Sequence, residues 1–259
     1  LDSGLLADLL GQVDLGDLLD PAIAERVEQE LQHTAQDRRV SGAEGVADLL
    51  RELGPLSTAQ LALRVDQPDD LDASLQTLST TGRAIAVSMA GETRWAAVED
   101  AARLRDALGV SLPAGIAEIF LQPVADPLRD LLARYARTHG PFTTGEAARY
   151  LGLGVAIVDH GLERLREQGK VLCGNFGVER RLEATLDASL TIAPKARHEW
   201  IADEVFKRLR LRSLQAAREA TRPVPGGAYV RLLLERQGLI AHTDGHPARA
   251  QEPPVRGAF

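Results

Sequence analysis

Basic side chains gathered in the second half of the sequence are its clearest candidates for chemistry. Residues 206–222 contain one acid, Glu219, and six basic residues: Lys207, Arg208, Arg210, Arg212, Arg218 and Arg222. Several arginines along one helix can neutralise phosphates, and each such contact makes binding more dependent on salt. We therefore predict that nucleic acid is contacted by Lys207, Arg208, Arg210 and Arg212. The alternative, an arginine face paired with acids elsewhere, stays open.

A second basic group precedes this one. Arg164, Arg166 and Lys170 can reach phosphates from the end of a predicted helix. Acids at positions 159, 163 and 167 lie among them, and a mixed-charge run is commonly just a solvated face. Both interpretations stay open, and we include the three basic residues among the predicted nucleic-acid contacts.

No nucleophile with a paired base is identifiable, so no catalytic residue is predicted. A single cysteine, Cys173, excludes an internal disulfide framework and a cysteine-based zinc site. His139 precedes a Gly-Pro turn and is predicted to be a satisfied turn residue. His242 and His246 have the spacing of metal ligands on a helix, but they lie in a Gly- and Pro-containing tail. We therefore predict no metal site.

The net charge of −7 conceals an asymmetry along the chain. Residues 1–81 carry 16 acidic and 5 basic side chains, whereas the remainder carries 21 and 25. Because phosphate binding depends on local charge, the sequence permits a nucleic-acid surface only in its second half. No apolar run approaches the roughly 18 residues needed to span a bilayer, so no membrane partner is predicted.

The elements that must position these residues occur twice. Four landmarks recur in the same order: a Gly-Pro-apolar-Ser/Thr-Thr motif, a glycine, a tryptophan and an Arg-Leu-Arg triplet. They begin at Gly54, Gly82, Trp95 and Arg103, and again at Gly140, Gly169, Trp200 and Arg208. The spacing between copies rises from 86 or 87 residues for the first two landmarks to 105 for the last two. This pattern indicates a duplicated unit with an insertion within residues 177–197.

Each copy has the same predicted element order. Apolar residues at three- and four-residue spacing indicate a helix that ends at Gly54 or Gly140, and a short bridging strand follows. Thr58 or Thr144 is the predicted N-cap of a brief second helix, before a third helix and two strands around the tryptophan. We therefore predict a mostly α fold with small β wings (α+β), consisting of tandem winged helix-turn-helix domains. A three-helix bundle with an unrelated hairpin is the alternative.

Five segments follow from these landmarks. They are an acidic helical lead-in (1–44), a first winged-helix domain (45–110), a linker (111–125), a second winged-helix domain with an extended wing and a basic C-terminal helix (126–222), and a C-terminal extension with a disordered end (223–259). Acids begin the third helix of the first copy, which is therefore predicted to be structural. Trp95 and Trp200 are predicted to pin each wing to its helices rather than to stack on bases.

One long segment resembles a known family. ETRWAAVEDAARLRDALGVSLPAGIAEIFLQPVADPLRDLLARYARTHGPFTTGEAARYLGLGVAIVDHGLERLREQGKVLCGNF is similar to the region beyond the motor domains of the Lhr family, which are large bacterial superfamily 2 ATP-dependent DNA helicases. EWIADEVFKRLRLRSLQAAREATRPV matches the same region, and the resemblance covers roughly residues 5–240. It rests on collinear similarity and not on a catalytic motif.

The resemblance implies a bacterial, cytoplasmic, DNA-binding segment. The implied partners are single-stranded or duplex DNA, contacted with little sequence preference, and the motor domains of the parent helicase. A homo-oligomer is a further expectation. ATP and Mg²⁺ are implied for the parent only, because the sequence has no GxxxxGK[ST] phosphate loop, and no cofactor is predicted for this segment.

Three functions stay open at this point. The first is an accessory region of a DNA-repair helicase that grips or guides DNA through phosphate contacts. The second is a DNA glycosylase-like domain for uracil or alkylated bases, since the chain is also similar to AlkZ-type glycosylases, although it lacks their Gln-x-Gln pair. The third is an interaction or oligomerisation scaffold that does not contact DNA.

Overall fold

The computed structural model describes residue 16, residues 19–177 and residues 198–220. The chain divides into two compact units, Leu1–Gln215 and Ala216–Phe259. Of the second unit only residues 216–220 are described, and they end a helix that begins in the first unit. Several predicted features lie outside the described residues. They are the predicted insertion after residue 177, the C-terminal extension, and the residues Arg222, His242 and His246.

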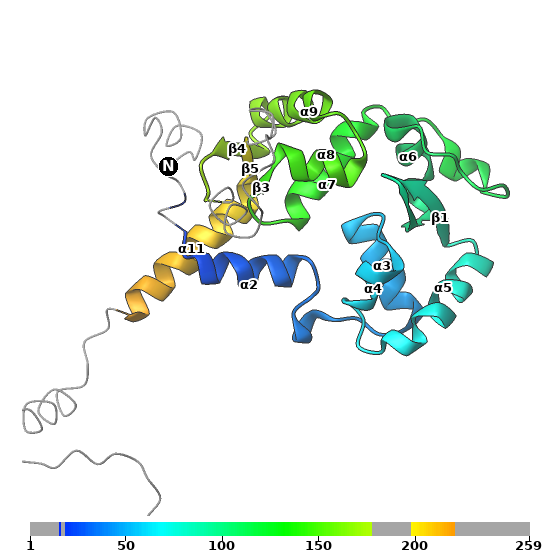
Figure 1. Ribbon diagram of the computed structural model, residues 1–259, viewed down its shortest axis with the longest axis horizontal. Coiled ribbons are helices and arrows are strands. Elements are labelled where there is room, and N and C mark those ends of the chain that lie inside the picture. Colours follow the sequence, from blue (N-terminus) through cyan, green and yellow to red (C-terminus); the bar gives the residue numbers. More distant parts are fainter. Residues whose placement is uncertain (1–15, 17–18, 178–197, 221–259) are drawn as a thin grey trace, which may run out of the picture. The chain divides into compact units, whose positions relative to one another are not determined.

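Two winged-helix modules account for most of the first unit (Figure 1). The first module contains α3 (Gly42–Leu53), α4 (Thr58–Ala62), α5 (Leu71–Thr80), β1 (Ala84–Met89), β2 (Glu92–Ala97) and α6 (Ala101–Leu108). The second contains α7 (Pro127–Thr138), β3 (Phe142–Thr143), α8 (Thr144–Leu151), α9 (Val155–Glu167), β4 (Val171–Gly174), β5 (Glu199–Ala202) and α11 (Asp203–Ala220). Helix α2 (Pro21–Leu31) precedes both, and short 3-10 turns are η2 (Gln36–Arg38), η3 (Pro68–Asp70), η4 (Val98–Asp100) and η5 (Glu118–Leu121). The predicted mostly α fold with small β wings is confirmed.

The two wings are antiparallel sheets of different size. In the first module β1 pairs with β2 so that Ala84 lies opposite Ala97, and Leu56 forms an isolated bridge to Trp95. In the second module the strand order is β3-β5-β4, with Phe142 opposite Trp200. The bridge at Leu56 therefore occupies the place that β3 takes in the second module.

The N-caps of the second helices lie one residue earlier than predicted. The Oγ of Ser57 accepts a hydrogen bond from the backbone N–H of Gln60 at 3.3 Å, while the Gln60 side chain accepts one from the backbone N–H of Ser57 at 2.9 Å. Thr143 and Glu146 form the same reciprocal pair in the second module. A capping box needs Gln or Glu three residues after the cap, which selects these positions. The predicted caps, Thr58 and Thr144, are the first helical residues instead.

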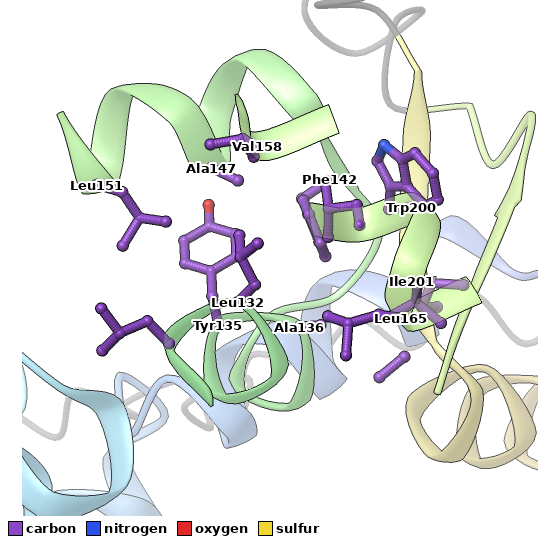
Figure 2. Close-up of a cluster of buried hydrophobic side chains, with 14 of the residues drawn as sticks. Leu132, Tyr135, Ala136, Phe142, Ala147, Leu151, Val158, Leu165, Trp200 and Ile201 are labelled. Atoms are coloured by element: carbon purple, nitrogen blue, oxygen red, sulfur yellow. The ribbon is translucent and has the colours of Figure 1, made fainter. Parts of the chain in front are cut away.

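Large apolar side chains fill the core of the second module (Figure 2). Leu132, Phe142 and Leu165 belong to the same apolar cluster as Trp200, which is completely buried. Its indole N–H donates to the Thr144 hydroxyl at 2.8 Å, so the core interpretation of Trp200 is confirmed. Trp95 is half-buried against the separate core of the first module's helices.

The first wing contributes to two cores. Along β1, Ile85, Val87 and Met89 are buried in the same apolar cluster as the second module, whereas the Ala84 side chain belongs to the first module's core. Alternate residues of a strand point to opposite faces, so this face of the wing joins an apolar cluster that also contains Ala101 and Leu104 of α6 and residues of the second module. At its tip, a Cβ added to Gly152 would lie 3.1 Å from the Cα of Ala90, which shows how closely the wing turn approaches the α8–α9 turn.

Polar contacts reinforce the junction between the modules. An Arg134 Nη1 donates to the Asp100 carboxylate at 2.6 Å, and both side chains are largely buried. Arg94 donates to the carbonyl oxygen of Tyr150 at 2.8 Å and lies over its ring, while the Tyr150 hydroxyl donates to the carbonyl of Pro55 at 3.1 Å. These contacts join the second module to both the wing and the helices of the first.

His139 is a partly buried residue at the C-terminal end of α7. Its Nδ1 lies 2.8 Å from the carbonyl oxygen of Tyr135, and its ring stacks on the Tyr135 ring with centroids 3.8 Å apart. Burial lowers the pKa of His139 from its ordinary value to about 4, against a smaller opposing effect of the Tyr135 hydrogen bond. The predicted satisfied turn residue is confirmed.

Candidate nucleic-acid interface

Helix α9 is the third helix of the second module and divides into a buried and an exposed side. Gly154 precedes its first turn in an extended conformation, and Val158, Leu162 and Leu165 form the buried stripe at the three- and four-residue spacing of a helix. The opposite side is exposed and carries an unusual combination of side chains for a solvated surface: Ala156, Ile157, His160 and Arg164.

Two of the three basic residues predicted on this helix already have acidic partners. Arg164 donates to the Asp126 carboxylate at 3.0 Å, and Arg166 donates to Glu163 at 2.7 Å. Both arginines are at least half exposed, so these pairs contribute little to stability and can exchange partners. Lys170 does not lie on this helix as predicted, because α9 ends at Glu167; it lies in the turn before β4, is exposed and forms no ion pair with any residue that the structure describes.

Helix α11 lies beside α2 (Figure 1). One of its sides is buried and the other is exposed. Phe206 and Leu209 are buried, and the Ser213 hydroxyl accepts a hydrogen bond from the backbone N–H of Asp20 at 2.9 Å. Leu211 and Leu214 remain exposed. The helix is therefore fixed to the second module and to the segment that begins α2, which holds its outer residues in defined positions.

The four basic residues predicted on α11 divide into paired and unpaired groups. Lys207 contacts Asp203 of the same helix at 2.6 Å, and Arg212 contacts Glu30 of α2 at 2.8 Å. Arg208 and Arg210 are exposed and form no ion pair within the described part of the chain. The two unpaired guanidinium groups are the side chains best placed to accept a phosphate, because no existing partner must be displaced.

A cavity of about 470 Å³ lies between α7, the end of α9 and the start of α11. Lys170 and Arg137 line it, but so do Asp203 and Glu204. Opposite charges in the same lining cancel much of its attraction for an anion. This cavity is therefore a weaker candidate for phosphate than the exposed arginines of α11.

Catalytic arrangements are sparse among the described residues. Burial raises the pKa of the half-buried Cys173 thiol to about 11, so it is a protonated, weak nucleophile at neutral pH. The Nδ1 of His198 lies 2.9 Å from the Asp159 carboxylate, and His33 contacts Glu52 at 3.1 Å. Neither pair lines the cavity above. The described residues also contain no group of three or more His, Cys, Asp or Glu side chains that can hold a metal ion.

Two exposed residues of α9, Ile157 and His160, were not predicted as site residues. The Ile157 side chain is 51% exposed. It lines a second hollow, which lies between α9 and the first turn of α7. The sequence does carry a signal for it, because Ile157 falls outside the Val158, Leu162 and Leu165 stripe. The arrangement of α9 around that stripe decides which apolar residues face solvent.

Comparison with known proteins identifies the family. The family model described as Large helicase-related protein, winged-helix domain, matches residues 17–123. A relative from Escherichia coli (strain K12), described as Lhr helicase/uracil glycosylase, is 49% identical over 249 residues, which are 96% of this chain. The chain belongs to the Lhr family. A second Lhr relative, from Mycolicibacterium smegmatis and described as Lhr helicase/ probable uracil glycosylase, is 43% identical over 90% of this chain.

This Lhr segment spans only a small part of its relatives, 15% of the Escherichia coli protein and 14% of the Mycolicibacterium protein. The family match covers α2, the first module and the following linker. Among the helices of the described residues, none is long and apolar enough to cross a membrane.

Proposed function

We propose that this Lhr segment is an accessory region that binds DNA through phosphate contacts and helps a parent DNA-repair helicase to grip or guide its substrate. The observation that carries the proposal is the pair of exposed arginines, Arg208 and Arg210, which flank the buried Leu209 on either side of an anchored helix. Cations held on a fixed helix attract phosphates without base-specific contacts, so little sequence preference is expected.

Salt-dependent binding tests this proposal directly. We would titrate labelled single-stranded and duplex DNA of equal length with the wild-type chain at about 50–200 mM salt, a range over which multi-phosphate contacts weaken steeply. The variant Arg208→Glu/Arg210→Glu is expected to bind at least roughly tenfold more weakly, and its log–log salt slope should be shallower by about 2, because two phosphate contacts are lost.

A control with the same change in charge separates this site from a general electrostatic effect. Arg38 and Arg39 are exposed neighbours in the acidic first part of the chain, and Arg38→Glu/Arg39→Glu alters the net charge by the same amount. A much smaller loss is expected in the control. Equal losses in the two variants, or no binding by the folded wild-type chain, would show that α11 is not a DNA grip.

The glycosylase function in the names of the relatives is a second candidate. It requires an acid, a base or a water-positioning group beside a base pocket. The Asp159–His198 pair is the most suitable described arrangement, since Asp159 is buried and His198 is partly exposed. A base-release assay tests this candidate. If the chain released uracil or alkylated bases and Asp159→Asn abolished the release, the result would favour the glycosylase function over a DNA-binding accessory role.

The parent helicase supplies the remaining partners in this proposal. ATP and Mg²⁺ would act in its motor domains, because this chain has no phosphate loop to hold them. We also propose a cytoplasmic location, where those motor domains and the chromosome meet. Self-association would instead support the scaffold hypothesis, and light scattering at several protein concentrations tests it.

A further inference from the structure

A groove lies on the exposed side of α9, between that helix and the first turn of α7. Its volume is about 330 Å³, and its walls include Leu128 from α7 with Ala156, Ile157 and Gly161 from α9. Its lining is mainly apolar. Small-molecule sites of proteins have volumes of about 300–1,000 Å³, so the groove is large enough for one flat aromatic group.

Close packing of the two helices shapes this groove. A Cβ at Gly161 would clash with the Cδ1 of Leu132, so glycine allows α9 to approach α7 directly. Ile157 remains half exposed at the other side of the groove rather than joining the core. The apolar surface is thus held open by the backbone and does not require a side chain to move.

Cationic and polar side chains border the apolar surface. Arg164 comes from α9 and Arg129 from α7, and the His160 ring lies on the same wall as Ala156 and Ile157. Asp126 caps α7 and pairs with Arg164 at 3.0 Å, while Arg129 pairs with Asp130 at 3.0 Å. Both arginines are partly exposed, so each can also turn toward an anion in solvent.

We propose that this groove binds one unpaired nucleobase of a single strand, with the flanking phosphates on Arg129 and Arg164. An apolar wall with an imidazole accepts the flat face of any base, and the arginines complement the charge of the backbone on either side. A base inside a duplex is stacked and paired and cannot enter. The inference rests on the proposed function, to which it adds the class of ligand and a site separate from α11.

The corresponding helix of the first module lacks these features. With the 87-residue offset between Gly82 and Gly169, the positions of Ala156 and Ile157 correspond to Asp69 and Asp70. Two exposed carboxylates in place of an apolar wall would repel a phosphate backbone. The groove is therefore a property of the second module and supplies internal control positions in the first.

Filling the groove tests the proposal. Ala156 is exposed, so Ala156→Phe should fold while occupying the space of a base; Ala73→Phe on the exposed side of α5 is the matched control. Ile157→Ser removes part of the wall, and Leu63→Ser, at an exposed leucine of the first module, is its control. Thermal melting confirms that each variant is folded.

Binding of each variant would be measured by fluorescence anisotropy with a single-stranded DNA, the RNA of the same sequence and a hairpin duplex. Ala156→Phe and Ile157→Ser should lose affinity for a single strand by roughly tenfold more than for the duplex, whereas the controls should show no such selectivity. Weaker binding of single-stranded DNA alone, or of both single-stranded DNA and RNA, supports a base in the groove. The comparison of the two probes shows which sugar-phosphate backbone the groove accepts.

Two results would overturn the inference. Equal losses on single strand and duplex, or unchanged single-strand binding, would show that no base enters the groove, even if the wild-type chain binds DNA through α11. If the folded wild-type chain binds neither DNA nor RNA, the proposed function itself is wrong, and this outcome is recognised without any groove variant.

Discussion

The two winged-helix modules share an element order but differ in what their outward faces contact. In the first module, Ile85, Val87 and Met89 on one face of the wing are buried in an apolar cluster that α6 and the second module share. In the second, strands β4 and β5 close the module's own core around Trp200. The order of helices and strands therefore does not decide which module can bind a ligand. The residues on the solvent-exposed faces decide it.

The third helices show the same contrast. Helix α5 begins after two exposed aspartates, Asp69 and Asp70, whereas α9 presents Ala156, Ile157 and Arg164 to solvent. Their buried stripes are equivalent under the 87-residue offset, since Leu71, Leu75 and Leu78 correspond to Val158, Leu162 and Leu165. Packing has thus kept the inner face constant while the outer face differs.

The largest expected effect comes from placing a charge in the first wing. Val87→Asp should lower the free energy of unfolding by about 4 kcal/mol, because an unpaired carboxylate would be buried in the apolar cluster that the two modules share. Ser88→Asp, one residue away on the exposed side, should change it by less than about 1 kcal/mol. Urea denaturation measures both. Similar effects in the two variants would mean that the wing face is not buried in solution.

A smaller effect is expected from breaking the charged contact at the junction. Arg134→Met should cost about 2 kcal/mol, because it leaves the buried Asp100 with Arg103 as its remaining partner. Arg51→Met removes an exposed ion pair with Asp48 and should cost less than about 1 kcal/mol. If denaturation showed the same cost for both substitutions, the junction would have no special role in joining the modules.

The smallest effect concerns the equivalent caps. Ser57→Ala and Thr143→Ala should each cost about 1 kcal/mol, since each removes the acceptor for an unsatisfied helix N–H. Thr143 is the more buried of the two, so its loss should be the larger, and Thr143→Ser should recover most of it. A greater loss at Ser57 would contradict this ranking.

The fold was predictable because its signals are local. Glycines end the helices, apolar residues repeat at helical spacing, and the capping motif occurs at equivalent places in both copies. The predicted caps, Thr58 and Thr144, lie one residue too late, because only Gln60 and Glu146, three residues after the true caps, distinguish one hydroxyl from the next.

The candidate interface was predictable only in part. A run of arginines on α11 indicates a basic surface, but Arg212 pairs with Glu30, which lies 182 residues away in the sequence. No local pattern specifies such a partner. The groove beside α9 depends in the same way on the contact of Gly161 with Leu132, which only the packed helices reveal.

The shared apolar cluster limits how this part of Lhr can be divided into fragments. A cut in the linker between α6 and α7 would divide this cluster and expose apolar side chains of the first module on one side and of α7 on the other. Neither product would retain the environment in which its side chains pack. The two winged-helix modules are therefore expected to tolerate truncation only when both are kept together.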